Sequence, residues 1–182
     1  KIIKLNPKFA KKKKTVTVSG AGTGVAGARV PFGGVVLATD KLNKIIDINQ
    51  KEKIIKLQPA VSLENIHNNI SSLDLAYNPD STEKSAFIGG NIATNASGAR
   101  AFKYGVTRQY IKSLNIILSN GKKISISRGK IFAKNRKINV PNYNEISLPD
   151  YTSPEIKNSA GYYVKPNMDL VDLFIGQEGT LG

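Results

Sequence analysis

The segment with the clearest chemical potential is the glycine-rich run Gly20–Gly27, which follows the β-branched run Thr15–Val18. Its glycines let the backbone adopt conformations that other residues avoid and bring its N–H groups close to a ligand. Successive amides that point into one concavity bind anions, and the hydroxyl group of Thr23 can add a donor. The segment therefore predicts a loop that holds phosphate, with a pyrophosphate as its natural ligand.

The type of loop follows from the residues after it. The spacing G-x-G-x-x-G that ends at Gly27 matches the dinucleotide-binding fingerprint, but that fingerprint must open a helix. No helix is expected here, because Pro31 and a glycine pair follow almost at once and Val35–Leu37 predicts another strand. A Walker loop would end in Gly-Lys-Ser/Thr, whereas Ala28 and Arg29 follow here. A glycine loop between two strands remains, and a plain connection without a ligand stays open as the alternative.

A second unusual stretch covers residues 77–100, where small residues and polar side chains dominate. Such a segment either lets two backbones approach closely or lies against a flat polar ligand. Its Asn and Thr side chains would be costly to bury without partners, which favours a ligand without excluding tight packing.

The composition limits the possible partners. The net charge of +14 would attract phosphates, but the only dense cluster of lysines is Lys11–Lys14 and no aromatic residues alternate with the lysines. A solvated, lysine-rich surface explains this charge better than a nucleic-acid interface. The chain has no cysteine, which excludes a disulfide, a thiolate metal site and a cysteinyl flavin link. It also has no apolar run near the roughly 20 residues of a membrane span.

Short strands and helices must position these segments. Residues 42–48 and 53–57 predict a hairpin, and Ser62 predicts the N-cap of a helix that buries Leu63, Ile66 and Ile70. The only histidine, His67, lies beside that face and is expected to be a packing residue.

The second half of the chain predicts fewer elements. Residues 111–118 and 124–126 predict two strands around a tight turn at 119–121, and residues 170–175 predict an apolar helix. Residues 129–160 lose periodicity and predict a long irregular excursion.

Five motifs in a fixed order carry a more specific resemblance. They are Gly20-Ala-Gly-Thr-Gly24, Pro79-Asp80-Ser81, Ile88-Gly-Gly-Asn-Ile-Ala-Thr-Asn95, Lys103-Tyr-Gly-Val-Thr107 and Gly176-Gln-Glu-Gly-Thr-Leu-Gly182. From about residue 15 onward the chain resembles the FAD-binding domain of the FAD-linked oxidases related to vanillyl-alcohol oxidase. Within that group it is most similar to the branch of D-lactate dehydrogenase and the glycolate oxidase FAD subunit. The resemblance implies an α+β domain of the vanillyl-alcohol oxidase (PCMH) type, with FAD bound non-covalently between two subdomains.

The resemblance also implies which residues contact the cofactor. The pyrophosphate contacts would be Gly20, Ala21, Gly22, Thr23, Gly24 and Val25. Pro79, Asp80 and Ser81 would lie along the flavin, and Glu178 and Gly179 would close the site. Further contacts would come from Gly89, Gly90, Asn91, Thr94, Asn95, Gly98 and Tyr104. Two departures from the family pattern are Ser19, where an arginine is frequent, and Arg29, where a small residue is common. No catalytic acid or base and no metal ligand is assigned.

The implied function is that of the FAD-binding part of a flavoprotein oxidoreductase that oxidises the CH–OH group of a 2-hydroxy acid such as D-lactate or glycolate. We expect the chain to be incomplete at both ends, with residues 1–60 in a first subdomain and 61–182 in a second. The substrate would bind through a C-terminal cap domain that this sequence lacks, and electrons would pass to an acceptor or a partner subunit.

Neither a nucleic-acid partner nor a transmembrane segment is expected. The expected location is the cytoplasm, with peripheral attachment to the inner membrane as a variant. Two alternatives remain open: the FAD domain of an enzyme like UDP-N-acetylenolpyruvoylglucosamine reductase, and a non-enzymatic basic module that binds nucleic acid.

Overall fold

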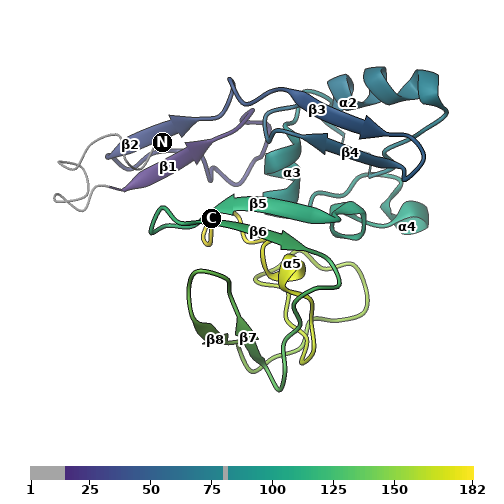
Figure 1. Ribbon diagram of the computed structural model, residues 1–182. Coiled ribbons are helices and arrows are strands. Elements are labelled where there is room, and N and C mark those ends of the chain that lie inside the picture. Colours follow the sequence, from purple (N-terminus) through teal and green to yellow (C-terminus); the bar gives the residue numbers. More distant parts are fainter. Residues whose placement is uncertain (1–14, 80–81) are drawn as a thin grey trace. The chain divides into compact units, whose positions relative to one another are not determined.

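The computed structural model describes residues 15–79 and 82–182 (Figure 1). The predictions made for Lys11–Lys14, Asp80 and Ser81 therefore lie outside the described residues. Within the described ranges the strands form four separate pairs, β1–β2, β3–β4, β5–β6 and β7–β8. The chain divides into two units: the described residues up to Asn91 join Ser97–Gly105 in the first, and Ile92–Ala96 joins Val106–Gly182 in the second. The predicted division at residue 60 stays a prediction.

The first pair in the first unit is parallel. Strand β1 (Val16–Ser19) pairs with β2 (Val35–Ala38), and Val16 lies opposite Val35. A parallel pair cannot be joined by a tight turn, because the chain must return to the starting end of the first strand, which takes about a dozen residues or more. The segment Gly20–Gly34 makes this return without a helix, so the predicted glycine loop between two strands is confirmed.

The second pair is the predicted hairpin. Strands β3 (Ile45–Asn49) and β4 (Ile54–Leu57) are antiparallel. The side chain of Asn49 begins the turn, since its Oδ1 accepts a hydrogen bond from the Glu52 N–H at 2.9 Å. Short polar side chains often satisfy turn amides in this way.

Helix α2 (Leu63–Ile70) starts where the sequence predicts. The Oγ of Ser62 accepts a hydrogen bond from the Asn65 N–H at 3.1 Å and so satisfies one of the free amides at the helix N-terminus. Leu63, Ile66 and Ile70 are buried as expected. The short helix η2 (Ser71–Leu73) continues the turn and ends at Asp74, which adopts a left-handed conformation.

Two helices lie in and directly after the polar stretch 77–100, where the sequence predicts none. They are α3 (Ile88–Thr94) and α4 (Ala101–Tyr104). Adjacent glycines disfavour a helix by about 1 kcal/mol each relative to alanine, so helical propensity alone would not reveal α3. Its first turn is held instead by neighbours distant in sequence: the Gly89 N–H donates to the Pro59 carbonyl at 2.8 Å and the Ile88 N–H to Val61 at 2.9 Å.

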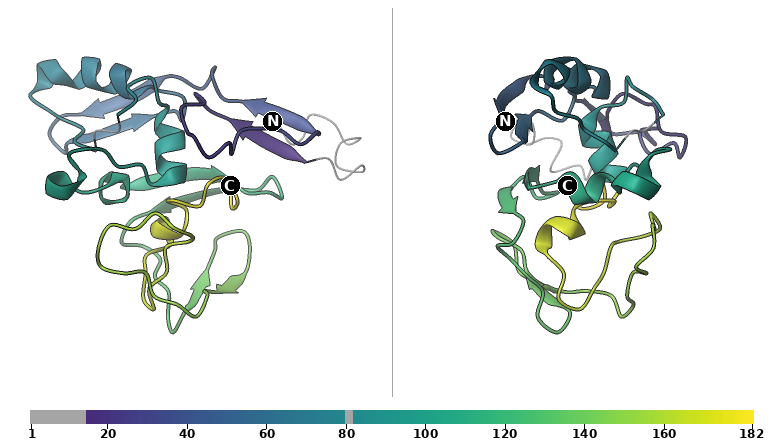
Figure 2. Two further views of the ribbon diagram at one scale, coloured as in Figure 1. Left: turned by 180° about the vertical axis from the view of Figure 1, so that it is seen from behind. Right: turned by 90° about the vertical axis from the view of Figure 1, so that its right-hand side faces the viewer.

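In the second unit, the segment from Val106 onward starts with helix η3 (Thr107–Tyr110) and the hairpin of β5 (Ser113–Ile117) and β6 (Lys123–Ser127). Ile124 and Ile126 alternate with exposed neighbours along β6, so one face of the hairpin is buried. Helix α5 (Leu170–Leu173) packs against β6 (Figure 2). The predicted strand pair and apolar helix are confirmed, although the first and last residues of these elements differ slightly from the predicted ones.

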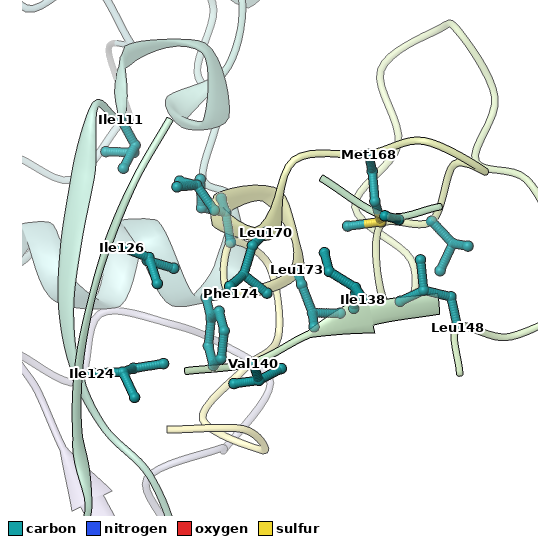
Figure 3. Packing of buried hydrophobic residues seen from close by; sticks show 14 of the residues in the cluster. Ile111, Ile124, Ile126, Ile138, Val140, Leu148, Met168, Leu170, Leu173 and Phe174 are labelled. Atoms are coloured by element: carbon teal, nitrogen blue, oxygen red, sulfur yellow. The ribbon is translucent and has the colours of Figure 1, made fainter. Parts of the chain in front are cut away.

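The excursion after residue 128 is more ordered than the sequence predicts. It holds a hairpin of β7 (Lys137–Asn139) and β8 (Glu145–Ser147). From this part of the chain Ile138, Val140 and Leu148 enter the hydrophobic core beside Phe174 (Figure 3). The prediction of an irregular excursion was wrong here, because three-residue strands are too short to show an alternating pattern.

Candidate functional site

The glycine loop presents backbone donors to solvent. Gly22–Val30 are exposed, and the N–H groups of Ala21–Val25 donate to no atom of the described residues. Gly22 has φ +78°, a conformation that L side chains rarely adopt. A row of unpaired N–H groups in an exposed turn is the arrangement that holds an anion.

Both ends of the loop are fixed to the strand pair. The Thr39 N–H and Oγ1 both donate to the Ser19 carbonyl at 3.1 Å, and the Val35 N–H donates to the Thr15 carbonyl at 2.9 Å. Gly34 passes so close to Thr15 that a Cβ on Gly34 would overlap the Thr15 carbonyl oxygen. Both ends of the loop are therefore held by the strand pair, which limits the conformational entropy that the loop can lose when a ligand binds.

The glycine loop also carries a cationic side chain, that of Arg29. The Nη1 of Arg29 donates to the Gly20 carbonyl at 3.4 Å, and a Cβ on Gly22 would overlap the Arg29 guanidinium. From the sequence, Arg29 was interpreted only as a departure from the family pattern. In the structure it adds positive charge to the same loop.

The predicted residues before α3 fall into two groups. Pro79 is buried in the first unit, whereas Asp80 and Ser81 lie outside the described residues. The role assigned to these three residues stays a prediction.

Gly89 and Gly90 at the start of α3 meet different surroundings. A Cβ on Gly89 would lie 2.7 Å from the Pro59 Cβ, so this glycine is required for packing. Gly90 has open space around its Cα, with nothing within 4 Å of a built Cβ. Asn91 is buried. Of the two interpretations of the polar stretch, close packing therefore explains Gly89, and Gly90 keeps room for a ligand.

Thr94 is the last residue of α3 and Asn95 follows it, and both belong to the second unit. Asn95 is buried and has φ +48°, an unusual backbone conformation for a residue with a side chain. Its Oδ1 accepts a hydrogen bond from the Arg108 N–H at 3.0 Å. That carbonyl oxygen therefore already has a structural partner.

Gly98 and Tyr104 belong to the first unit. The Gly98 carbonyl accepts a hydrogen bond from the Ala101 N–H at 3.0 Å and begins the turn into α4. The Lys103 Nζ lies 5.1 Å from the centre of the Tyr104 ring, and this ring is partly exposed.

Glu178 and Gly179 form an exposed turn in the second unit. Glu178 has φ +54°, and its N–H donates to the Ala93 carbonyl at the end of α3, at 2.8 Å. The preceding Gly176 N–H donates to the Ile92 carbonyl at 2.9 Å. These bonds join two of the predicted motifs within one unit. A strained, exposed residue at such a position is typical of functional sites.

The sequence missed an ion-pair cluster that supports this turn. Asp172 accepts from Arg108 at 3.3 Å and from Arg128 at 3.0 Å, and the Arg108 Nη2 also donates to the Ile175 carbonyl at 2.6 Å. Burial lowers the pKa of Arg108, opposed by the charge of Asp172. Hydrogen bonding to Asp172 raises the pKa of Arg128. The only signal in the sequence is that Arg108 directly follows the motif Lys103–Thr107.

Other classes of site find little support in the described part of the chain. Residues 15–79 and 82–182 contain no group of three His, Cys, Asp or Glu side chains that could hold a metal ion. No helix among them is long and apolar enough to cross a membrane. His67 is half-buried, as expected for a packing residue, and its Nε2 has no hydrogen-bond partner among the residues that the structure describes.

The predicted site residues are thus divided between two units. The first unit holds the glycine loop, Pro79, Gly89, Gly90, Asn91, Gly98 and Tyr104, and the second holds Thr94, Asn95, Glu178 and Gly179. That all of them contact one ligand stays a prediction.

Comparison with known proteins gives consistent matches. The family model described as "FAD binding domain" matches residues 3–127. The D-lactate dehydrogenase of Anaerostipes hadrus is 34% identical over 168 residues, which are 92% of this chain and 29% of that protein. The glycolate oxidase subunit GlcD of Bacillus subtilis is 35% identical over 165 residues, which are 90% of this chain and 28% of that protein. The chain thus spans less than a third of the length of these relatives.

Solved structures share the fold at low sequence identity. An alkyldihydroxyacetonephosphate synthase has a TM-score of 0.63 at 17% identity and covers 94% of this chain and 28% of its own. The 6-hydroxy-D-nicotine oxidase of Arthrobacter nicotinovorans has a TM-score of 0.61 at 18% identity and covers 68% of this chain and 27% of its own. The predicted α+β fold class is confirmed.

Proposed function

Because this chain belongs to the FAD binding domain family, we propose that it is the FAD-binding part of a flavoprotein oxidoreductase that oxidises a 2-hydroxy acid such as D-lactate or glycolate. Relatives named D-lactate dehydrogenase, D-2-hydroxyglutarate dehydrogenase and glycolate oxidase support this substrate class. The enzyme class is that of FAD-dependent oxidoreductases acting on CH–OH groups.

The residues of the glycine loop fit FAD. The observation that carries this conclusion is the exposed row of N–H groups at Ala21–Val25, which no described residue satisfies. A pyrophosphate can accept from several of them at once. The absence of a side chain on Gly22 lets the Arg29 guanidinium lie against the same loop. Bound FAD would supply the electron-accepting ring for the oxidation. The loop residues would bind and orient that group through their N–H donors and would transfer no proton in the reaction.

The substrate is proposed to bind through residues beyond the described sites. The relatives are more than three times as long as the matched segment, and a cap domain in the remaining length would supply groups for the carboxylate and the reacting hydroxyl. An electron acceptor or a partner subunit would then take the electrons. For location we propose the cytoplasm, with peripheral attachment to the inner membrane as the variant.

A visible absorption spectrum tests the proposal most directly. The purified chain, incubated with FAD and freed of unbound cofactor, should show the two absorption bands of an oxidised flavin. Because the chain has no cysteine, acid precipitation should leave the yellow colour in the supernatant. A colourless protein that also fails to quench FAD fluorescence would contradict the proposed cofactor, and colour in the pellet would contradict the non-covalent attachment.

A further inference from the structure

The guanidinium of Arg29 lies over Gly22 in the glycine loop, although the two residues are seven positions apart. Its Nη1 donates to the Gly20 carbonyl at 3.4 Å, which is at the long end of the hydrogen-bond range. This is the only hydrogen bond that the Arg29 side chain makes to a described residue, and no described carboxylate pairs with it.

The surroundings of this cation favour an anion. A guanidinium offers five N–H donors in a planar fork, and here one of them is used, weakly. The N–H groups of Ala21–Val25 in the same loop are also unpaired among the described residues. Donors and positive charge therefore accumulate in one exposed turn, where no described residue supplies a negative charge.

We propose that Arg29 binds the pyrophosphate of the cofactor, together with the loop amides; this inference rests on the proposed function. The guanidinium would exchange its long bond to the Gly20 carbonyl for two short, charge-assisted bonds to phosphate oxygens. A lysine at the same place could offer the charge but not the paired geometry. Arg29 thus extends the anion site from the first half of the loop to its second half.

The test compares Arg29→Gln with Lys51→Gln, in which an exposed lysine in the turn between β3 and β4 is changed. Both variants lower the net charge by the same amount. Calorimetric titrations with FAD and with inorganic pyrophosphate give the dissociation constants. For Arg29→Gln we expect both constants to rise about tenfold, the factor that corresponds to about 1.4 kcal/mol, whereas Lys51→Gln should stay close to the wild type. Arg29→Lys should recover part of the loss. Lumiflavin, which has no phosphate, should bind equally to all variants.

A measurement on the unmodified chain makes the test independent of any variant. The NMR signal of the Arg29 Nε–H group should shift when pyrophosphate is added, because the guanidinium changes its acceptor. An unchanged signal at saturating pyrophosphate would overturn the inference. Circular dichroism confirms that each variant is folded.

The outcomes separate the two proposals. If the wild type and Arg29→Gln bind FAD equally well, the inference is wrong and the proposed function stands. If pyrophosphate binds in an Arg29-dependent way but FAD does not, Arg29 binds an anion and the proposed function fails. If the wild type binds neither probe, both are overturned.

Discussion

Arg108 and Asp172 are 64 positions apart in the sequence and form an ion pair with a separation of 3.3 Å. Arg108 also lies 4.2 Å from the centre of the Tyr163 ring and donates to the Ile175 carbonyl. The same guanidinium therefore contacts Tyr163 before α5 and Ile175 after it, and Ile175 lies three residues before Glu178.

Asp172→Asn should destabilise the fold. Arg108 and Arg128 share the Asp172 carboxylate, and the loss of one partner from a largely buried ion pair costs about 3 kcal/mol. We expect the free energy of unfolding, measured in urea, to fall by about 2–3 kcal/mol, because these side chains keep some exposure to water. Asp150→Asn is the matched control: its carboxylate is 98% exposed and pairs with Arg136, so its loss should cost less than about 0.5 kcal/mol. Equal effects of the two changes would show that the cluster does not support the fold.

Gly22→Ala tests the strain in the glycine loop. A side chain at φ +78° is unfavourable, and its Cβ would displace the Arg29 guanidinium. We expect the variant to lose about 1–2 kcal/mol of unfolding free energy and to bind FAD much more weakly. Gly24→Ala is the control for stability, because Gly24 has no positive φ and no atom within 4 Å of a built Cβ. Unchanged FAD affinity in a folded Gly22→Ala variant would mean that the pyrophosphate binds elsewhere.

The adjacent glycines of α3 should respond in opposite directions. Gly89→Ala would bring a Cβ to 2.7 Å from the Pro59 Cβ, and such overpacking costs about 1–3 kcal/mol. Gly90→Ala meets open space and should raise the stability of the cofactor-free chain by up to about 1 kcal/mol through helix propensity. Thermal unfolding without FAD measures both. If Gly90 contacts FAD as predicted, Gly90→Ala should also weaken FAD binding despite its greater stability, and unchanged binding would remove Gly90 from the site.

Glu83 gives a prediction for pH dependence. Its Oε1 accepts hydrogen bonds from the Ser85 N–H at 2.9 Å and the Ser85 Oγ at 2.8 Å, and these bonds lower the pKa of Glu83. A lowered pKa in the folded state means that this contribution to stability is present above the unfolded-state pKa and is lost as the pH falls through the folded-state pKa. NMR titration of the Glu83 carboxylate should therefore show a low pKa, and Ser85→Ala should raise it towards the ordinary value. Titration at an ordinary value in the wild type would contradict the hydrogen bonding.

Local signals in the sequence predicted the elements that local chemistry determines. Ser62 caps α2 through its own side chain, and the turns of both long hairpins contain suitable polar residues. Helix α3 could not be predicted in this way, because its two glycines oppose a helix and its first turn depends on carbonyl groups from Pro59 and Val61.

The candidate site shows the same limit. The glycine loop was predicted from its glycines and from Pro31 and the apolar run Val35–Leu37 that follow it in the sequence. The fold of Arg29 back over Gly22 and the pairing of Arg108 with Asp172 depend on the path of the chain in space. These contacts join residues that are separated in the sequence, so no local sequence pattern predicts them.

The parallel orientation of β1 and β2 affects the order of folding. The β3–β4 hairpin needs only a short turn and can close within microseconds, whereas β1 can meet β2 only after the whole segment Gly20–Gly34 has closed as a loop. Little burial of apolar side chains offsets the entropy lost on that closure, since Val16, Val18 and Val36 are about half exposed. The strand pair that carries the glycine loop should therefore form late and open early, with rapid hydrogen exchange in β1 and β2.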